Sequence, residues 1–446
     1  MLGVIAALML ICAGLIYFNQ TRTDNREKVD SQIFTRFQYI YLGVYLCMTF
    51  SDWLQGAYVY VLYESYGYGI DMISKLFVVG FLSSMLFGTI IGALSDKLGR
   101  KNICLAFVVL YIISCITKHS SNLTVLLIGR LTGGIATSIL YSSFESWMVY
   151  EHFNRHNFSS SWIGDTFYKQ TFSNGIIAII AGFVSNLLYN LFNRSPVAPF
   201  DAAIVCLMIG GGLIVYFWEE NYGDRTGDYA KNFSEGFKVI RSDFRVLCVA
   251  ISQSFFEAAM YIFVLMWTPT LTNSVKGQEE LDIGYIFAAF MIAVMIGSLV
   301  FRALLVNSDE MEKKDEQSVA LGAWRSPEYI LLFVFALALI SLIIPIVSSS
   351  FNLILFGFLV FEFCVGIFWP AISTVKSVYI PEDVRSTVMN YIRIPTNFLV
   401  VLSLYFVDNI PQFPVCCLLL TVALGSQYWL LQHKASIQNT STSLAL

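Results

Sequence analysis

The sequence predicts an all-α membrane protein made of two six-helix bundles, with one extra helix at the N-terminus. Three observations support this fold class. Hydrophobic residues make up 57% of the 446 residues and charged residues only 13%, about half the charged fraction of a soluble domain. Apolar stretches long enough to cross about 30 Å of hydrocarbon recur along the chain. Basic residues gather in alternate breaks between these stretches, which is typical of a multi-pass protein.

The first apolar stretch, at about 2–18, precedes its positive charges at Arg22, Arg26 and Lys28. A secretory signal peptide has the opposite order, with its charges before the apolar run. We therefore expect a retained hydrophobic helix and basic linker over 1–36, with the N-terminus outside. Cleavage of this segment is the alternative.

Twelve further spans complete the predicted fold. The N-terminal half, 37–218, is expected to hold six of them, near 37–63, 73–95, 102–117, 123–147, 170–192 and 199–218. The C-terminal half, 244–432, is expected to hold the other six, near 244–272, 283–306, 327–347, 351–376, 387–408 and 412–432. A charged cytosolic linker, 219–243, separates the halves, and a tail, 433–446, follows the second.

The lysines and arginines fix the orientation. The breaks after 18, 95, 147, 218, 306 and 376 carry most of them, including Lys376, and are therefore placed in the cytosol. The opposite side keeps only Lys75, Lys118, Arg194 and Lys276.

Cofactor and nucleic-acid binding are not expected. No basic block indicates nucleic acid, and the nine cysteines include no C-x-x-C pair, so neither a disulfide framework nor a metal cage is predicted. His152 and His156 have the i, i+4 spacing of a metal pair, but no third ligand is near them in the sequence. We therefore predict no metal and no cofactor.

A short loop carries the sharpest local signal, Gly92-Ala-Leu-Ser-Asp96-Lys97-Leu-Gly99-Arg100-Lys101, at the end of the second of the twelve spans. Its glycines allow close helix approach and a sharp turn at the membrane surface. The pattern resembles the signature loop of the major facilitator superfamily, and Arg130-Leu-Thr-Gly133-Gly134 resembles a second motif of that superfamily. By this resemblance the protein adopts the major facilitator fold, and Asp96 and Arg100 stabilise one access state by bridging helices.

Ionisable residues inside spans cost about 2.5–3.5 kcal/mol each on insertion scales, so they usually face a cavity or a partner. The candidates in such positions are Asp52, Arg130, Glu145, Glu257, Glu362 and Arg393. The halves also echo each other, since Arg130 followed by Gly134 aligns with Glu362 followed by Gly366. Such duplication places a transporter's central site at the repeat interface. The alternative is that these charges pair as structural salt bridges.

Several short sequence motifs indicate a particular family within the superfamily. Asp52-Trp-Leu-Gln-x-x-Tyr58, Phe144-Glu145-x-Trp147, Trp267-Thr-Pro269 and Arg393-x-Pro395 resemble the eukaryotic molybdate-anion transporter family, and the resemblance runs from about residue 30 to 432. It implies uptake of molybdate through the plasma membrane, with an internal membrane as the alternative location.

Molybdate is a tetrahedral dianion, and arginine offers fork-shaped donors to its oxygens. The candidate binding residues are therefore Arg130 and Arg393, supported by Gln55, Tyr58, Asn174 and Asn397. Carboxyl groups shielded from water favour their protonated form, so Asp52, Glu257 and Glu362 are candidate proton carriers, with Glu257 preferred, or charge partners of the arginines.

Three alternatives to molybdate transport remain. A carrier for another anion such as sulfate keeps every feature above, and a non-transporting sensor or scaffold would need no buried opposite charges. An enzyme would need a nucleophile with its base or a metal triad, which the sequence lacks. We expect a monomer in the lipid bilayer, glycosylated at the exoplasmic sequon of Asn122.

Overall fold

The computed structural model describes residues 1–21, 32–223, 238–275, 281–312, 326–380 and 385–444, and every regular element within them is helical. These residues form two compact units. The first unit holds Met1–Ile5, residues 32–223 and Leu281–Met291. The second holds residues 6–21, 238–275 and 292–444. The predicted all-helical class is confirmed.

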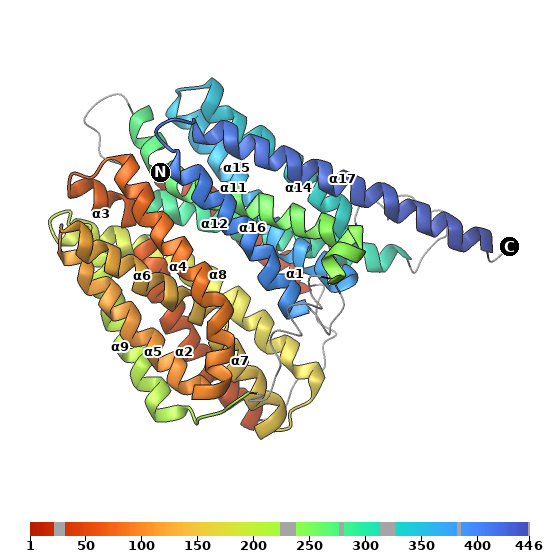
Figure 1. The fold of residues 1–446 in the computed structure, drawn as a ribbon, viewed down its shortest axis with the longest axis horizontal. Helices are drawn as coiled ribbons and strands as arrows, with labels where there is room; N and C mark the ends of the chain where they lie inside the picture. Colours follow the sequence, from red (N-terminus) through yellow and green to blue (C-terminus); the bar gives the residue numbers. More distant parts are fainter. Residues whose placement is uncertain (22–31, 224–237, 276–280, 313–325, 381–384, 445–446) are drawn as a thin grey trace. The chain divides into compact units, whose positions relative to one another are not determined.

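The first unit contains a helix or helix pair for each of the first six predicted spans (Figure 1). In chain order these helices are α2 (Gln32–Gly56), α3 (Val59–Ser65), α4 (Ile70–Leu98), α5 (Arg100–Ile116), α6 (Leu123–Leu140), α7 (Ser143–Tyr150), α8 (Ser160–Leu191) and α9 (Ala198–Phe217). Two predicted spans are interrupted, one between α2 and α3 at residues 57–58 and the other between α6 and α7 at residues 141–142. Hydropathy does not register the second break, because one candidate span, Leu123–Arg155, runs across it.

Helix α8 begins at Ser160, well before the predicted start near 170. The extra turns mix polar and aromatic residues, and one of them is supported by an ion pair between Lys169 and Asp165 at 2.8 Å, one helical turn apart.

The second unit contains the helices of the last six predicted spans. They are α11 (Phe244–Ser274), α12 (Ile283–Glu312), α14 (Pro327–Val347), α15 (Phe351–Tyr379), α16 (Arg385–Tyr405) and α17 (Gln412–Leu444). Helix α12 starts in the first unit and continues into the second, and the N-terminal helix α1 (Leu2–Thr21) also divides between the units.

Ten helices of the described chain are long and apolar enough to cross a membrane. Helices α2 and α16 reach the length but not the apolarity, and α1 has a shorter apolar run, Leu2–Phe18. The lower apolarity of α2 and α16 has a plain origin, because these two helices carry the candidate site residues Asp52, Gln55, Arg393 and Asn397.

Glycines set the closest helix contact in each unit. In the first, a Cβ at Gly134 of α6 would lie 2.4 Å from the Gly80 carbonyl oxygen of α4. In the second, a Cβ at Gly366 of α15 would lie 2.0 Å from the Val294 carbonyl oxygen of α12. No side chain fits at either crossing. The two glycines therefore hold the same role in helix pairs that correspond in the two halves, in agreement with the duplication read from the sequence.

The segment between α5 and α6 is expected on the exoplasmic side of the membrane, and Asn122 offers a test of this orientation. Asn122 is exposed and caps α6 by accepting the Thr124 N–H at 2.9 Å. We predict that Asn122 is glycosylated. An Asn122→Asp variant keeps a cap oxygen but destroys the sequon, so it should lose the gel shift that a glycosidase gives in the wild type while keeping its melting temperature. Asn122→Gln should also lose the shift and about 1 kcal/mol of stability. A shift that persists in Asn122→Asp would contradict the assignment.

Candidate functional site

The loop motif folds as one tight turn between α4 and α5. Gly99 joins the two helices with a φ of +100°, a left-handed value that favours glycine. The Glu220 carboxylate accepts the backbone N–H groups of Lys101 at 2.8 Å and Asn102 at 3.1 Å, and so caps the N-terminus of α5. A Cβ at position 99 would lie 2.4 Å from Glu220 Cδ. Only glycine therefore fits there.

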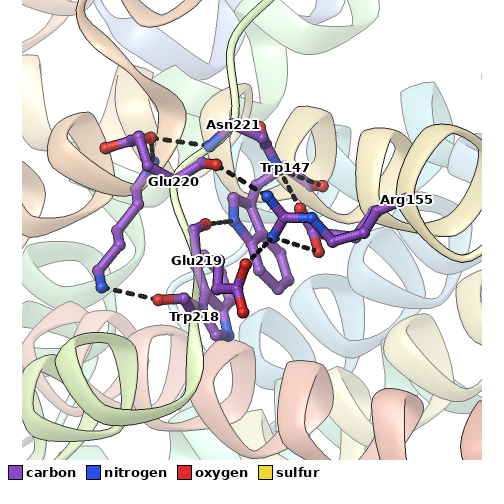
Figure 2. A network of polar contacts seen from close by, with 8 residues as sticks. Trp147, Arg155, Trp218, Glu219, Glu220 and Asn221 are labelled. Carbon is purple, nitrogen blue, oxygen red and sulfur yellow. Dashed lines mark hydrogen bonds and ion pairs between the residues drawn. The ribbon is translucent and has the colours of Figure 1, made fainter.

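Glu220 belongs to a short segment, residues 218–223, that we call the strap. Figure 2 shows the strap crossing the first unit beside Trp147 of α7. Trp218 stacks on Trp147 with ring centroids 3.7 Å apart, and the Trp147 indole N–H donates to the Glu219 carbonyl at 2.9 Å. Most of these residues belong to the segment expected to be the linker between the halves. The start of this linker is thus bound to the first unit.

Ion pairs tie the strap to the π-helical turn Glu151–Arg155 that follows α7. Arg155 contacts the carboxylate of Glu219 at 3.1 Å (Figure 2) and that of Glu151 at 3.1 Å. Asn221 Nδ2 donates to the Glu151 carboxylate at 2.8 Å. The strap therefore connects the α4–α5 turn, α7 and the π-helical turn in one polar network.

The other members of the loop motif lie around the same turn. Arg100 pairs with Asp96 at 2.8 Å, and its backbone N–H donates to the Asn221 carbonyl at 2.9 Å. A Cβ at Gly223 would lie 2.0 Å from Asp96 Oδ1, so the strap passes directly over this ion pair. Gly92 is exposed on α4, with open space where a Cβ would be.

Asp52 and Arg130 lie in the first unit without an ion pair between them. Asp52 accepts a hydrogen bond from the Tyr111 hydroxyl. Arg130 Nε donates to the Leu76 carbonyl at 3.0 Å, and the guanidinium lies 4.5 Å from the centroid of the Phe77 ring. A carbonyl and an aromatic face thus hold the arginine. Its Nη groups donate to no acceptor in the part of the chain that is described.

Three other candidate residues of the first unit have partners inside that unit. Gln55 donates to a carbonyl of its own helix, that of Ser51, at 2.9 Å. The Tyr58 hydroxyl donates to Asn186 at 3.0 Å, and Asn174 accepts the Trp53 indole N–H at 3.0 Å. These side chains are held in fixed orientations, which a binding site needs.

The second unit gathers three charges from three helices. Glu257 of α11 is buried and accepts a hydrogen bond from Gln253 at 2.6 Å. Lys376 of α15 and Arg393 of α16 are its electrostatic neighbours. Lys376 is 7% exposed, although the sequence placed it in a cytosolic break, because α15 extends three residues beyond it. Arg393 is exposed, and Asn397 donates to its backbone carbonyl at 2.9 Å.

Glu362 stands apart from these charges. It lies in α15 with 7% of its surface exposed, and no described residue forms a hydrogen bond or ion pair with it. Removing an unpaired carboxylate from water costs much more free energy than removing the neutral acid. Glu362 is therefore suited to hold a proton.

Sequence reasoning missed three groups of this arrangement: Lys118, Lys376 and the strap. The two lysines end apolar runs, where a positive charge is ordinarily solvated. For the strap a signal was available, because Glu219 and Glu220 follow α9 at the same membrane face as Arg100 and Lys101. Opposite charges at one face favour contact.

Comparisons with known sequences place the chain beside transporters. Residues 1–367 match a major facilitator family described as sugar transporters with 12 transmembrane segments. The chain is 31% identical over 426 residues to the molybdate-anion transporter of Takifugu rubripes, covering 90% of this chain and 85% of the relative. The molybdate-anion transporter of Xenopus tropicalis is 30% identical over 409 residues, with 90% and 87% covered.

Solved structures agree on the fold. A peptide transporter of the POT family in complex with sulfate superposes with a TM-score of 0.67 at 12% identity, covering 90% of this chain and 95% of that one. The nucleoside transporter NupG gives a TM-score of 0.63 at 12% identity, with 88% and 97% covered. The predicted major facilitator fold is confirmed.

The cap on α5 predicts a contrast between two adjacent glutamates. Glu220→Ala leaves the first N–H groups of α5 without their acceptor, so the free energy of unfolding should fall by about 1–2 kcal/mol. Glu219→Ala removes only an exposed ion pair, so the expected loss is below about 1 kcal/mol. Thermal melting of the purified variants in detergent measures both. Equal losses would show that Glu220 has no capping role.

Proposed function

From the premise that this chain belongs to the major facilitator superfamily, and within it to the molybdate-anion transporter family, we propose that it imports molybdate by alternating access. The chain is a multi-pass membrane transporter. The observation that carries the anion assignment is the cluster in the second unit, where Lys376 and Arg393 share the single carboxylate of Glu257. With all three groups charged, the cluster is net positive and attracts an anion. Relatives that are transporters favour a carrier over an enzyme.

The proposed binding residues are Arg130 and Arg393, with Lys376 added to the pair. The side chain of Arg393 is exposed, and Arg130 keeps its Nη groups unengaged by described acceptors. Arginine presents paired N–H donors that match two oxygens of a tetrahedral anion. The hydroxyl and amide groups of Gln55, Tyr58, Asn174 and Asn397 would complete the hydrogen bonding.

Import of a dianion needs an energy source. Moving two negative charges against 100 mV, inside negative, costs about 4.6 kcal/mol, so an uncoupled carrier would leave the inside roughly 2,000-fold poorer in the anion. We propose that protons move inward with the substrate, because a single proton offsets only half of this electrical cost. Glu362 is favoured over Glu257 and Asp52 as a proton carrier, because Glu257 has two cationic neighbours and Asp52 has the Tyr111 hydroxyl.

The remaining proposals concern the state of the protein in the cell. The loop motif and the strap would stabilise one access state through Asp96 and Arg100. The carrier would act as a monomer in the plasma membrane, with protons and molybdate as its partners. Imaging of the tagged protein and its mass in detergent test these points, and an internal membrane or a stable dimer would contradict them.

The binding proposal predicts loss of uptake at Arg393. Molybdenum content of cells that express Arg393→Ala at normal surface levels should rise at least tenfold more slowly than with the wild type. Arg393→Lys should recover only part of the rate, because an ammonium cannot repeat a bidentate contact. Arg245→Ala, which removes an arginine paired with Asp243 at 2.7 Å near the start of α11, is the matched control. Normal uptake by Arg393→Ala would refute the assignment.

Competition by excess sulfate in the same assay distinguishes a carrier that prefers molybdate from a general carrier of tetrahedral dianions. If molybdate is preferred, a tenfold excess of sulfate should leave most of the molybdenum uptake intact. If sulfate abolishes uptake at equal concentration, the protein is a carrier of tetrahedral dianions in general.

The coupling proposal predicts a distinct phenotype at Glu362. In vesicles that contain Glu362→Gln, molybdate should still exchange across the membrane but should no longer accumulate in response to an inward proton gradient. The isosteric amide keeps the size of the side chain and cannot release a proton. Glu257→Gln is the comparison, and it should impair exchange itself because it removes the carboxylate shared by two cations. Gradient-driven accumulation that survives in Glu362→Gln would contradict the proposal.

A further inference from the structure

Lys118 is a buried cation that neither the family resemblance nor the proposed transport cycle accounts for. It lies in the 3-10 turn Thr117–His119 between α5 and α6 and is 2% exposed. Its Nζ has no hydrogen bond of standard geometry to a described acceptor. Its electrostatic neighbours are Tyr63, Cys115 and a second cation, Arg130. No described carboxylate is among them.

The packing of α6 brings the two cations together. Gly129 precedes Arg130, and a Cβ at Gly129 would lie 3.1 Å from Lys118 Nζ. The Ser114 hydroxyl donates to the Gly129 carbonyl at 2.7 Å and fixes α5 against α6 at this point. The absence of a side chain at residue 129 thus leaves the ammonium directly beside the helix that carries the arginine.

A buried lysine beside a half-buried arginine, without a described counter-charge, raises the free energy of the empty protein. Their donors remain largely unused, because Arg130 engages only Nε with a carbonyl and Lys118 Nζ lacks a described acceptor. The Tyr63 hydroxyl is likewise buried and without a hydrogen-bond partner of standard geometry. An anion with several oxygens would satisfy all three groups.

The short helix α3 packs beside Lys118 as a lid. Helix α3 is separated from α2 by the break at residues 57–58 and carries Tyr63, whose ring centroid is 5.6 Å from Lys118 Nζ. Just after α3, the Tyr66 hydroxyl donates to the Lys118 carbonyl, and the Tyr68 hydroxyl donates to the Ser121 carbonyl at 2.6 Å. Movement of α3 about the break would break these two hydrogen bonds and uncover the lysine.

We propose that Lys118, Arg130 and the Tyr63 hydroxyl form an oxyanion site at the outer end of the first unit, closed by α3 when empty. The site would receive the incoming tetrahedral dianion as the first step of transport. Two fixed cations favour a dianion over a monovalent anion. This inference rests on the proposed inward transport of an oxyanion. It adds to that proposal a binding site that the substrate occupies first.

Transport kinetics give the first test. In cells that express the full chain, Lys118→Met should raise the KM for external molybdate at least tenfold and leave the maximal rate within about twofold. Lys75→Met, which removes an exposed lysine paired with Asp71 at 2.7 Å, should change neither value. A merely structural lysine would lower the maximal rate and the surface level without raising KM. That outcome, or an unchanged KM, overturns the proposal.

Chemical labelling gives a second test that does not depend on transport. A Lys118→Cys variant should react with external methanethiosulfonate ethylsulfonate, an anion, faster than the wild-type background. Molybdate or sulfate, at concentrations above the KM of the Lys118→Met variant, should slow the reaction at least fivefold while chloride does not. Absence of labelling, or labelling that is indifferent to both dianions, overturns the site. Wild-type cells that accumulate no molybdenum would instead overturn the proposed function, and protection by the dianions would still establish the site.

Discussion

Positive charge without a paired carboxylate is the constraint on which this structure depends. Among the described residues, the half-buried Arg130 is held by a carbonyl and an aromatic ring and the buried Lys118 by aromatic and helix packing. The buried Lys376 and the exposed Arg393 both have the Glu257 carboxylate as an electrostatic neighbour. Such an arrangement costs free energy in an empty protein. It is explained if a mobile anion supplies the missing charge during transport, and glycines beside the cations leave the room that their side chains need.

The end of the first unit that holds the strap follows the opposite rule. There the carboxylates of Glu220, Asp96 and Glu151 are engaged by the N-terminus of α5, by Arg100 and by Arg155. This end is tied together by the strap, whereas Lys118 and Arg130 have few partners. Binding energy is therefore available where the substrate is expected to enter, and rigidity is concentrated where the linker leaves the first unit.

The sequence predicted the helices well and the charge partners only in part. Long apolar runs mark spans directly, and a charge inside such a run, as at Arg130 or Glu362, is visible without a structure. The break at 141–142 is not visible in hydropathy, because the apolar span Leu123–Arg155 runs across it. Lys118 and Lys376 were assigned to loops because their burial depends on how neighbouring helices pack. The capping role of Glu220 depends on a contact across more than a hundred residues, which neither spacing nor hydropathy reports.

The central claim is that this protein binds a tetrahedral dianion with cations that lack a paired carboxylate. Isothermal titration of the purified protein in detergent, with molybdate added at constant ionic strength set by chloride, tests that claim most directly. The account predicts a saturable heat that is abolished when Lys118→Met and Arg393→Ala are combined and is absent when chloride replaces molybdate. A wild-type protein that gives no saturable heat with molybdate or sulfate would contradict it.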